Sequence, residues 1–245
     1  MLESFQATFA VPLTCESCVE DISKPLYEIK GVNKVEADLK NQLVLVEGTA
    51  APSAIVTAIQ DTGRDAVLRG SGSSNNASVC ILETHARVPV PIRGLARMVQ
   101  ISTQRTLVDL TINGLAPGTY WATVRAAGDV SRGAASTGGI WGAGSSPAAV
   151  AGSPDNGRGV FGQVVVDARG KGNVFLDRPV AVWELIGRSM VVSRDRSGPF
   201  KADDPNTIVG VIARSAGVWD NDKMVCSCSG KNVWQEREEQ LARGM

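Results

Sequence analysis

Two closely spaced cysteine pairs are the residues of this 245-residue sequence best suited to do chemistry. Cys15 and Cys18 are separated by two residues, and Cys226 and Cys228 are separated by one. Thiolates bind soft metal ions such as Cu(I) and attack disulfides, and carboxylates compete poorly for such ions. His85 is the one histidine of the sequence, so the chain alone cannot build a zinc or copper site from several imidazoles.

The first cysteine pair falls where an expected strand passes into an expected helix. Apolar residues alternate between 5 and 11, and then recur at helical spacing between 19 and 29, with Pro25 inside the helical pattern. The free amide groups and the positive dipole end at a helix start favour thiolate, the form that binds metal. We therefore expect Cu(I) binding by Cys15 and Cys18. A redox dithiol, half of a zinc site and a structural pair are the alternatives.

Residues 1–70 have the pattern of a small α+β domain. The strand and helix above are followed by expected strands and one further helix, at 35–39, 43–46, 55–63 (the helix) and 66–68. The order β-α-β-β-α-β is that of a ferredoxin-like domain. The small, polar run 70–76 is expected not to pack, and it marks a linker at 71–77.

The segment 78–221 is expected to be an all-β domain. Strand-like runs separated by turn signals lie at 78–82, 94–101, 108–112, 120–125, 164–167, 173–176, 189–192 and 208–213. The stretch from Gly128 to Gly172 holds 12 of the 26 glycines, which is typical of long loops between strands. A Greek-key sandwich or barrel is the expected architecture. The polar segment 222–245, with the second cysteine pair, is expected to be a mobile tail with one or two helical turns.

Charge, hydropathy and cysteine content exclude several classes of protein. Lys and Arg together number 25, as do Asp and Glu, and this balance disfavours a nucleic-acid binder. Residues 1–70 carry 6 basic and 10 acidic side chains, which marks them as a separate unit. No run approaches the roughly 20 apolar residues of a membrane span, and the first residues do not resemble a secretory signal. We expect no membrane span, no disulfide scaffold and a cytoplasmic location.

The run Leu13-Thr14-Cys15-Glu16-Ser17-Cys18 resembles the M-x-C-x-x-C loop of the heavy-metal-associated domain found in copper chaperones and copper-pumping ATPases. In that family the methionine packs beneath the loop, so leucine at position 13 is a nearly volume-conserving change. Arg64 falls where the family often has a lysine near the metal. The resemblance implies that Arg64 offsets the negative charge of a bis-thiolate copper centre, and an ordinary solvated arginine is the alternative.

The second domain resembles copper/zinc superoxide dismutase over most of residues 78–216. The best-matched stretches are 94–97, 113–118, 128–133, 185–192 and 210–213. The enzyme's metal-binding histidines align with Thr123, Arg125, Ile140 and Ser193, and its disulfide cysteines align with Ala134 and Val209. The resemblance therefore implies a dismutase fold without zinc and without dismutase activity, which serves as shape.

The order of a metal-associated domain, a dismutase-like domain and a C-terminal C-x-C resembles the copper chaperones for superoxide dismutase, in particular their fungal forms. The resemblance implies a cargo of Cu(I), copper/zinc superoxide dismutase as partner, and help with that enzyme's internal disulfide. A disulfide closed across one residue is strained, so Cys226 and Cys228 are expected to hold Cu(I) or exchange with thiols of another chain.

Docking is expected to imitate the two-fold dimer of the enzyme. By alignment the docking patch contains Gly128, Ile186, Gly187, Ile212, Arg214 and Trp219. A homodimer is a further expected assembly, and family resemblance adds the mitochondrial intermembrane space as a location.

Two other functions compete with copper delivery. An active dismutase with an appended copper-loading domain requires histidines at the aligned positions, which the sequence lacks. A copper-independent thiol oxidoreductase is distinguished by whether the purified protein binds Cu(I) stoichiometrically.

Overall fold

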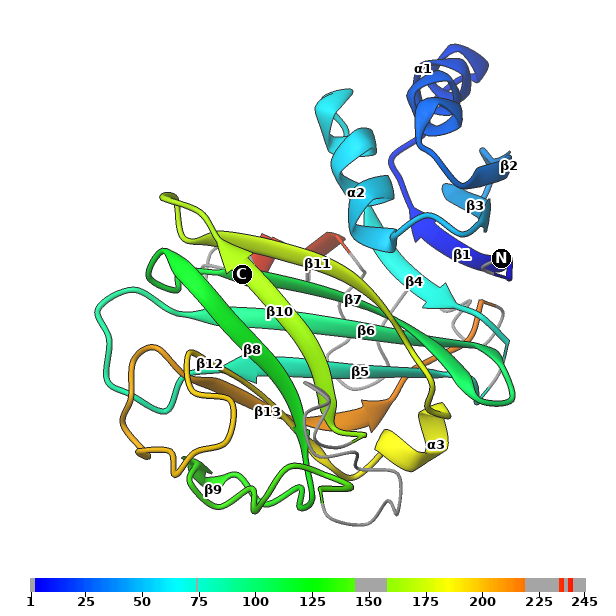
Figure 1. Cartoon of the computed structure of the whole chain (residues 1–245). Coiled ribbons are helices and arrows are strands. Elements are labelled where there is room, and N and C mark those ends of the chain that lie inside the picture. Colours follow the sequence, from blue (N-terminus) through cyan, green and yellow to red (C-terminus); the bar gives the residue numbers. More distant parts are fainter. Residues whose placement is uncertain (1–2, 74, 144–157, 219–233, 236–237, 240–245) are drawn as a thin grey trace. The chain divides into compact units, whose positions relative to one another are not determined.

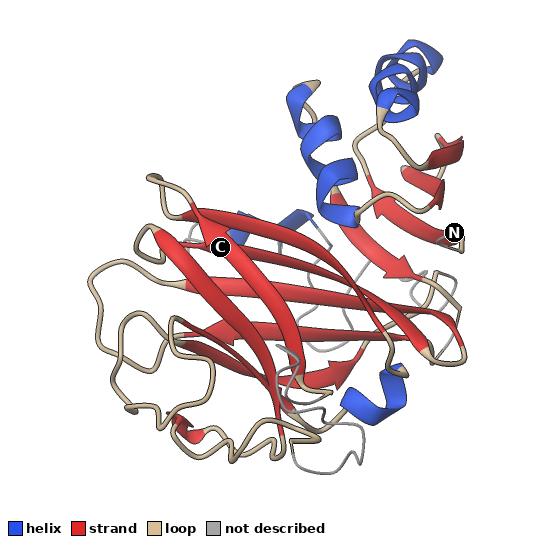
Figure 2. Cartoon of the chain, viewed as in Figure 1, coloured by secondary structure: helices blue, strands red, loops and turns tan. Residues whose placement is uncertain are grey.

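The computed structural model describes residues 3–73, 75–143, 158–218, 234–235 and 238–239, and these form two compact units. The first unit contains the described chain up to Ala77 together with described residues after Arg214, and the second contains Ser78–Arg214. The first unit mixes helices with a sheet, whereas the second is built almost wholly of strands (Figure 2).

The first unit has the expected β-α-β-β-α-β order. Its elements are β1 (Phe5–Ala10), α1 (Glu16–Glu28), β2 (Val32–Asp38), β3 (Leu43–Gly48), α2 (Pro52–Asp61) and β4 (Val67–Ser71). Within the described residues the strands form one sheet in the order β2-β3-β1-β4, and β1 pairs antiparallel with both of its neighbours. The ferredoxin-like prediction is confirmed.

Both helices of this unit lie on the same face of the sheet (Figure 1). Alternation along β1 and β3, and spacing of three to four residues along the helices, bring apolar side chains into one core. The core contains Ala7, Phe9, Val44, Val46, Ile22, Leu26, Ile55 and Ile59. The helix α1 continues through Pro25, because the buried Ile22 and Leu26 on either side hold that turn against the sheet.

The segment between the two units differs from the expected linker. The strand β4 extends to Ser71, and β5 (Ala77–Glu83) already begins at Ala77, so the ends of the 71–77 run are packed. The backbone of Ser71 donates to the carbonyl of Ala216 at 3.4 Å, and that of Val218 donates to the carbonyl of Gly72 at 2.9 Å. The prediction that this run cannot pack is wrong at its ends, because backbone hydrogen bonds outweigh the weak strand preference of small polar residues.

The second unit is a closed β-barrel. Its barrel strands are β5, β6 (Arg93–Ser102), β7 (Arg105–Asn113), β8 (Gly118–Arg125), β10 (Val160–Val166), β11 (Lys171–Arg178), β12 (Ser189–Ser193) and β13 (Ile208–Arg214). In the described residues they follow one another around the barrel in the order β10-β11-β7-β6-β5-β13-β12-β8, and β8 closes the barrel on β10. Each of the expected strand-like runs coincides with one of these strands, except that Asp167 lies one residue beyond β10, so the all-β prediction is confirmed.

The barrel interior is filled by large apolar side chains. They include Met98, Leu110, Tyr120, Phe161, Leu185 and Ile212, together with the thiol of Cys80. Two short elements escaped the sequence patterns, the strand β9 (Ser131–Ala134) and the helix α3 (Val182–Leu185). A segment of four residues is too short to show the two-residue period of a strand or the 3.6-residue period of a helix.

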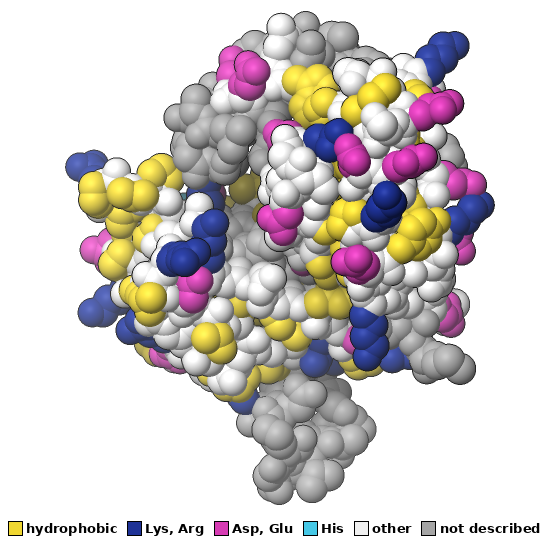
Figure 3. Space-filling model, turned by 90° about the horizontal axis from the view of Figure 1, so that it is seen from above, with side chains coloured by type: hydrophobic (Ala, Val, Ile, Leu, Met, Phe, Trp, Pro, Cys, Tyr) yellow, Lys and Arg dark blue, Asp and Glu magenta, His cyan; other side chains and the backbone are white. Residues whose placement is uncertain are grey.

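The surface agrees with the balanced composition. Acidic and basic side chains are interspersed on the face shown in Figure 3. Within the described residues, no helix has the length and apolar content that a membrane span requires.

Candidate copper site and docking face

The loop between β1 and α1 brings the thiols of Cys15 and Cys18 together. Their sulfur atoms are 3.2 Å apart, and both cysteines are free. Cys15 has extended backbone and is the N-cap residue of α1, immediately before Glu16, so the two thiols lie over the first turn of the helix. The Sγ of Cys15 lies 3.0 Å from the Oγ of Ser17, and the Sγ of Cys18 lies 3.4 Å from the Oγ1 of Thr14. Two adjacent, accessible sulfur ligands are what a soft cation needs.

The surroundings of Cys18 stabilise its thiolate. Hydrogen bonds from the hydroxyl and the backbone amide of Thr14, followed by contacts with Arg64 and Cys15, lower the pKa of Cys18 from 9.0 to about 6. Above pH 6 the negative form therefore prevails at this sulfur, without further help from a metal. A low thiol pKa at an exposed loop suits both metal capture and thiol exchange.

Arg64 and Leu13 take the places that the resemblance implied. The guanidinium of Arg64 donates to the carboxylate of Asp21 on α1 at 3.2 Å, and it also contributes to the lowered pKa of Cys18. Leu13 is buried, as the resemblance implied for this position. Arg64 is thus tied to the site and is not an ordinary solvated arginine.

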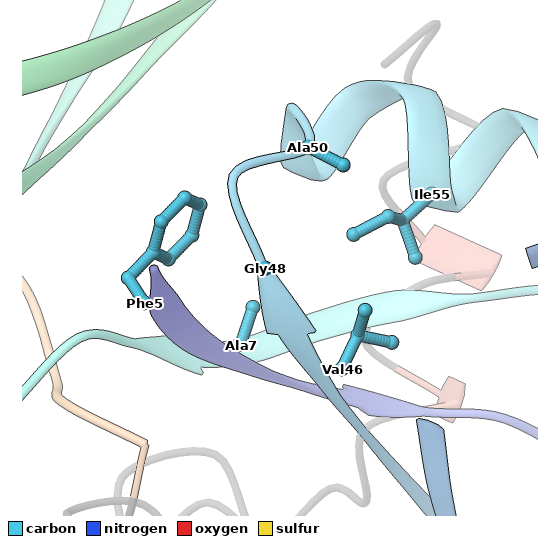
Figure 4. A pocket seen from close by; sticks show the side chains of 6 residues that line it. All are labelled: Phe5, Ala7, Val46, Gly48, Ala50 and Ile55. Carbon is cyan, nitrogen blue, oxygen red and sulfur yellow. The ribbon is translucent and has the colours of Figure 1, made fainter. Parts of the chain in front are cut away.

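An apolar pocket lies at the opposite end of this sheet. It is lined by Phe5, Ala7, Val46, Gly48, Ala50 and Ile55 (Figure 4). The start of β1 and the end of β3 contribute to it, whereas the cysteine loop follows the end of β1. The pocket carries no polar side chain and takes no part in the thiol site.

In the barrel, a buried arginine lies where the resemblance to dismutase implied a histidine. Arg125 is only 2% exposed. Its guanidinium donates to the carbonyl oxygens of Gly138 (2.8 and 3.2 Å), Arg196 (3.3 Å) and Ser197 (3.1 Å), and lies 4.9 Å from the centre of the Phe200 ring. Burial lowers the pKa of Arg125, and the charge of Asp195 opposes that change.

The other aligned positions hold neutral side chains. Thr123 is buried and donates to the carbonyl of Val191 at 3.4 Å, and the buried Ser193 accepts from Thr207 at 2.9 Å. Ala134 and Val209, which align with the enzyme's disulfide cysteines, lie together in a small apolar cluster with Val191. At the positions that align with the enzyme's metal ligands and disulfide cysteines, the barrel is thus held together by apolar packing and by hydrogen bonds.

Comparison with known proteins assigns each unit to a family. The heavy-metal-associated domain matches residues 8–65, and copper/zinc superoxide dismutase (SODC) matches residues 92–211. The Superoxide dismutase 1 copper chaperone of Debaryomyces hansenii is 44% identical, over 100% of this chain and 99% of the relative. That of Saccharomyces cerevisiae is 38% identical over 99% and 98%. The Copper chaperone for superoxide dismutase of Homo sapiens is 34% identical over 96% and 89%.

The chain belongs to the family of copper chaperones for superoxide dismutase. The two units follow one another in the order that the sequence motifs predicted. For a chaperone of this family, the thiol loop is the candidate copper site, and the barrel is the candidate surface for meeting a partner.

Two of the predicted docking residues, Gly128 and Gly187, lie next to each other on the barrel. Gly187 donates from its backbone to the carbonyl of Ile212 at 2.9 Å, with a left-handed φ of +82° that suits glycine. A Cβ on Gly128 would lie 2.2 Å from the Gly187 carbonyl oxygen and 3.6 Å from Val211, so only glycine fits there. Ile186 is half-buried beside them.

One predicted side chain points the other way. Ile212 is 1% exposed and lies in the barrel core, whereas its neighbour Val211 is 39% exposed. Side chains alternate along a strand, so the outward positions of β13 are Val211 and Ala213. The side chain of Ile212 therefore cannot line a docking surface, and Val211 is the exposed neighbour on the same strand. Arg214 is exposed at the end of β13.

An exposed tryptophan that the sequence analysis passed over adjoins this face. Trp183 on α3 is 72% exposed and precedes Ile186 by one helical turn. The sequence signal that could have found it is a tryptophan three residues before Ile186. We use "docking face" below for Gly128, Trp183, Ile186, Gly187, Val211 and Arg214. Trp219, Cys226 and Cys228 lie outside the described residues.

Proposed function

We propose that this chain carries Cu(I) on Cys15 and Cys18, docks on copper/zinc superoxide dismutase through the docking face, and promotes formation of that enzyme's internal disulfide through Cys226 and Cys228. One contrast carries the proposal. The first unit presents two free thiols 3.2 Å apart at its surface, while the barrel holds Arg125 where the resemblance implies a copper ligand. A protein with this pair of features can carry copper but has no imidazole site at which to cycle it.

The oxidation state of the cargo follows from ligand chemistry. Two thiolates satisfy Cu(I), a soft ion that accepts low coordination numbers, whereas Cu(II) and Zn²⁺ need further nitrogen or oxygen ligands. The pKa of Cys18 near 6 keeps one ligand charged at neutral pH. Transfer then proceeds by ligand exchange, in which incoming thiolates replace Cys15 and Cys18 one at a time.

Docking follows from the apolar and glycine-rich character of the docking face. Val211 and Trp183 offer exposed apolar side chains, and Gly128 and Gly187 bring the backbone to the surface. On the neighbouring strand, Ile81 also points outward, next to β13. A dismutase subunit that leaves its own dimer presents a surface of the same fold, so a barrel of this kind can replace one subunit of the pair. A homodimer of this chain would use the same face.

The tail supplies thiol exchange. When a thiolate of the target attacks an oxidised tail, one sulfur–sulfur bond breaks as another forms, and the target's second thiolate then releases the tail as a dithiol. The two electrons that the target loses thus reside on Cys226 and Cys228. An external thiol oxidant must remove them before another round.

The decisive experiment mixes the full chain with metal-free, reduced copper/zinc superoxide dismutase and Cu(I), and measures complex mass and dismutase activity. We expect a mixed dimer and a gain of activity. Val211→Glu should block both, because it places an unpaired charge in the interface without straining the backbone. Val165→Glu is the matched control, since Val165 is also an exposed strand valine of the barrel. Equal behaviour of the two variants would contradict the docking face.

The remaining alternative, a copper-independent thiol oxidoreductase, makes the opposite prediction. It would form the target's disulfide equally well after Cys15 and Cys18 are replaced by serine and copper is supplied free. Measuring formation of the target's disulfide with that variant, under the same supply of free copper, separates the two functions.

A further inference from the structure

The helix α3, which presents Trp183, is too short to hold its own position. It has four residues, and isolated helices below about 12 residues are marginal in water. Contacts with the rest of the barrel therefore fix it. Val182 and Leu185 are fully buried, and the backbone amide of Val182 donates to the side chain of Gln100 at 2.8 Å.

On its other side, α3 is tied to a cluster of charged and aromatic side chains. We call Trp141, Arg158, Glu184 and Arg188 the Trp141 cluster. The carboxylate of Glu184 accepts two hydrogen bonds from Arg158, at 2.6 and 2.7 Å, and a third from the backbone of Ala181 at 3.0 Å. The guanidinium groups of Arg158 and Arg188 each lie 4.7 Å from the centre of the Trp141 ring. Such contacts are attractive, and the two-pronged ion pair is directional.

The cluster rests on the barrel wall. The backbone of Trp141 donates to the carbonyl of Val124 on β8 at 3.0 Å, and Gly159 donates to the carbonyl of Trp141 at 2.8 Å. The Trp141 ring also packs against the barrel core. Arg158 is the residue immediately before Gly159, so these hydrogen bonds also hold Arg158 at a fixed distance from β8.

The same cluster reaches the loop that contains Gly128. Arg188 donates to the carbonyl of Ala126 at 2.9 Å and to that of Glu184 at 2.8 Å. The next residue, Ser189, donates to the carbonyl of Ala127 at 2.6 Å. Both α3 and the loop before Gly128, which supply separate parts of the docking face, are therefore joined through Arg188 and its neighbours.

We propose that the Trp141 cluster is a positioning device for docking, which holds α3 and the loop at Gly128 in the arrangement that the partner dismutase requires. The proposal rests on the proposed function. A face assembled before the encounter loses little conformational freedom on binding, so affinity depends on residues that never touch the partner. Arg158 and Glu184 are positioning residues in this sense, and they act through Trp183 and Ile186.

The test measures the affinity of the full-length chain for metal-free copper/zinc superoxide dismutase by titration calorimetry, alongside urea unfolding. We expect Arg158→Ala to weaken binding by about fivefold to tenfold, the effect of losing pre-organisation. Arg105→Ala is the matched control, because Arg105 makes an equivalent two-pronged ion pair with Asp177 elsewhere on the barrel. It should leave affinity unchanged. Arg158→Lys, which keeps the charge, should restore part of the lost affinity.

A double-mutant cycle shows whether Arg158 acts through Trp183. Trp183→Ala alone should weaken binding by about thirtyfold, as expected for a central aromatic contact. In that background Arg158→Ala should add little, because the side chain that Arg158 positions is gone. Full additivity would overturn the proposal.

The outcomes also separate this proposal from the proposed function. Loss of affinity in Trp183→Ala with none in Arg158→Ala would leave docking intact and refute the positioning role. Equal losses in Arg158→Ala and Arg105→Ala, matched by equal losses of stability, would reduce the cluster to a general stabiliser and also refute it. No loss in either Trp183→Ala or Val211→Glu would refute the docking face itself.

Discussion

The thiol loop of the first unit and the surroundings of Arg125 in the barrel differ in how they accommodate positive charge. At the loop, two sulfur atoms lie 3.2 Å apart at the surface, and the pKa of Cys18 is lowered to about 6. In the barrel, a guanidinium of the chain itself is buried among three carbonyl oxygens. The first region offers two sulfur atoms to a cation from outside, whereas the second already contains a cationic side chain.

The difference separates two uses of metal-binding folds. An exposed pair of ligands on a loop can exchange its metal through intermediates that share ligands, which suits a carrier. In the barrel, Arg125 lies over the Phe200 ring, and Ala134, Val191 and Val209 form an apolar cluster against which Phe200 packs. Under the proposed function, the fold serves as a recognition surface, and ligand exchange takes place elsewhere in the chain.

The largest effect is expected at the thiol loop. In a chain whose Cys226 and Cys228 are already serine, replacing Cys15 and Cys18 by serine should abolish Cu(I) binding, because hydroxyls are poor ligands for a soft ion. Competition with a Cu(I)-specific chelator measures it. The circular dichroism spectrum should not change, since the exposed sulfurs contribute little to the core.

Cys80→Ala is the control for that experiment. Cys80 is buried in the barrel, and burial raises its pKa to about 12, so it should not bind copper at neutral pH. If Cu(I) stays bound after the loop cysteines are removed, or leaves after Cys80 is replaced, the copper site has been misassigned.

The next effect concerns Arg125. Arg125→Ala removes the hydrogen bonds to Gly138, Arg196 and Ser197 and leaves their carbonyls without this donor, which should cost on the order of 3 kcal/mol of unfolding free energy. Urea denaturation of the full chain measures the loss. Arg169→Ala, at an exposed turn, should change stability by less than about 0.5 kcal/mol.

The Arg125 variant also tests whether the barrel is a latent metal site. Copper binding should not increase on removal of the guanidinium, because Thr123 and Ser193 offer only hydroxyls. Unchanged stability would show that the buried guanidinium does not hold the barrel together. Newly acquired copper binding would show that the barrel is a latent metal site.

A smaller effect is expected in the pH dependence of Cys18. The thiolate is the reactive form, so alkylation of Cys18 should rise through a midpoint near pH 6 and level off above it. The largest contribution to the low pKa comes from the Thr14 hydroxyl, so Thr14→Val should move the midpoint upward, toward the ordinary value of 9.0. Thr14→Ser keeps a hydroxyl and should keep the midpoint. Mass spectrometry of alkylated peptides at several pH values distinguishes these cases, and a profile identical in all three proteins would contradict the role of Thr14.

Most of the fold follows from local pattern. Alternation around Phe9, helical spacing around Ile22 and the regular runs of the barrel each report which side of an element is buried, and that is a property of neighbouring residues. Where the decisive contacts are distant, pattern fails. The strand β4 continues to Ser71 because Ala7 and Ala216 pair with it, and nothing in the run itself shows this.

Only part of the chemistry of the site could be predicted from the sequence. The spacing of Cys15 and Cys18 and the missing histidines are visible in the sequence, but the contact of Thr14 with Cys18 and the carbonyl cage of Arg125 exist only after folding. The docking face shows the same limit. An alignment selects Ile212, yet the orientation of β13 buries Ile212 and makes Val211 the exposed residue.

The smallest effect is expected at Leu13, which sharpens the distinction between the loop's shape and its chemistry. Leu13 is buried at the position where the family usually has methionine, and the two side chains have nearly equal volumes. Leu13→Met should therefore change unfolding free energy by less than about 1.5 kcal/mol and leave the Cu(I) affinity unaltered. Leu13→Ala should cost about 2–5 kcal/mol, because it leaves a cavity under the loop. Urea unfolding and chelator competition on both variants measure shape and chemistry separately. If Leu13→Met tightened copper binding, the thioether would be acting as a ligand, and the view that this position supports the loop only by packing would have to be abandoned.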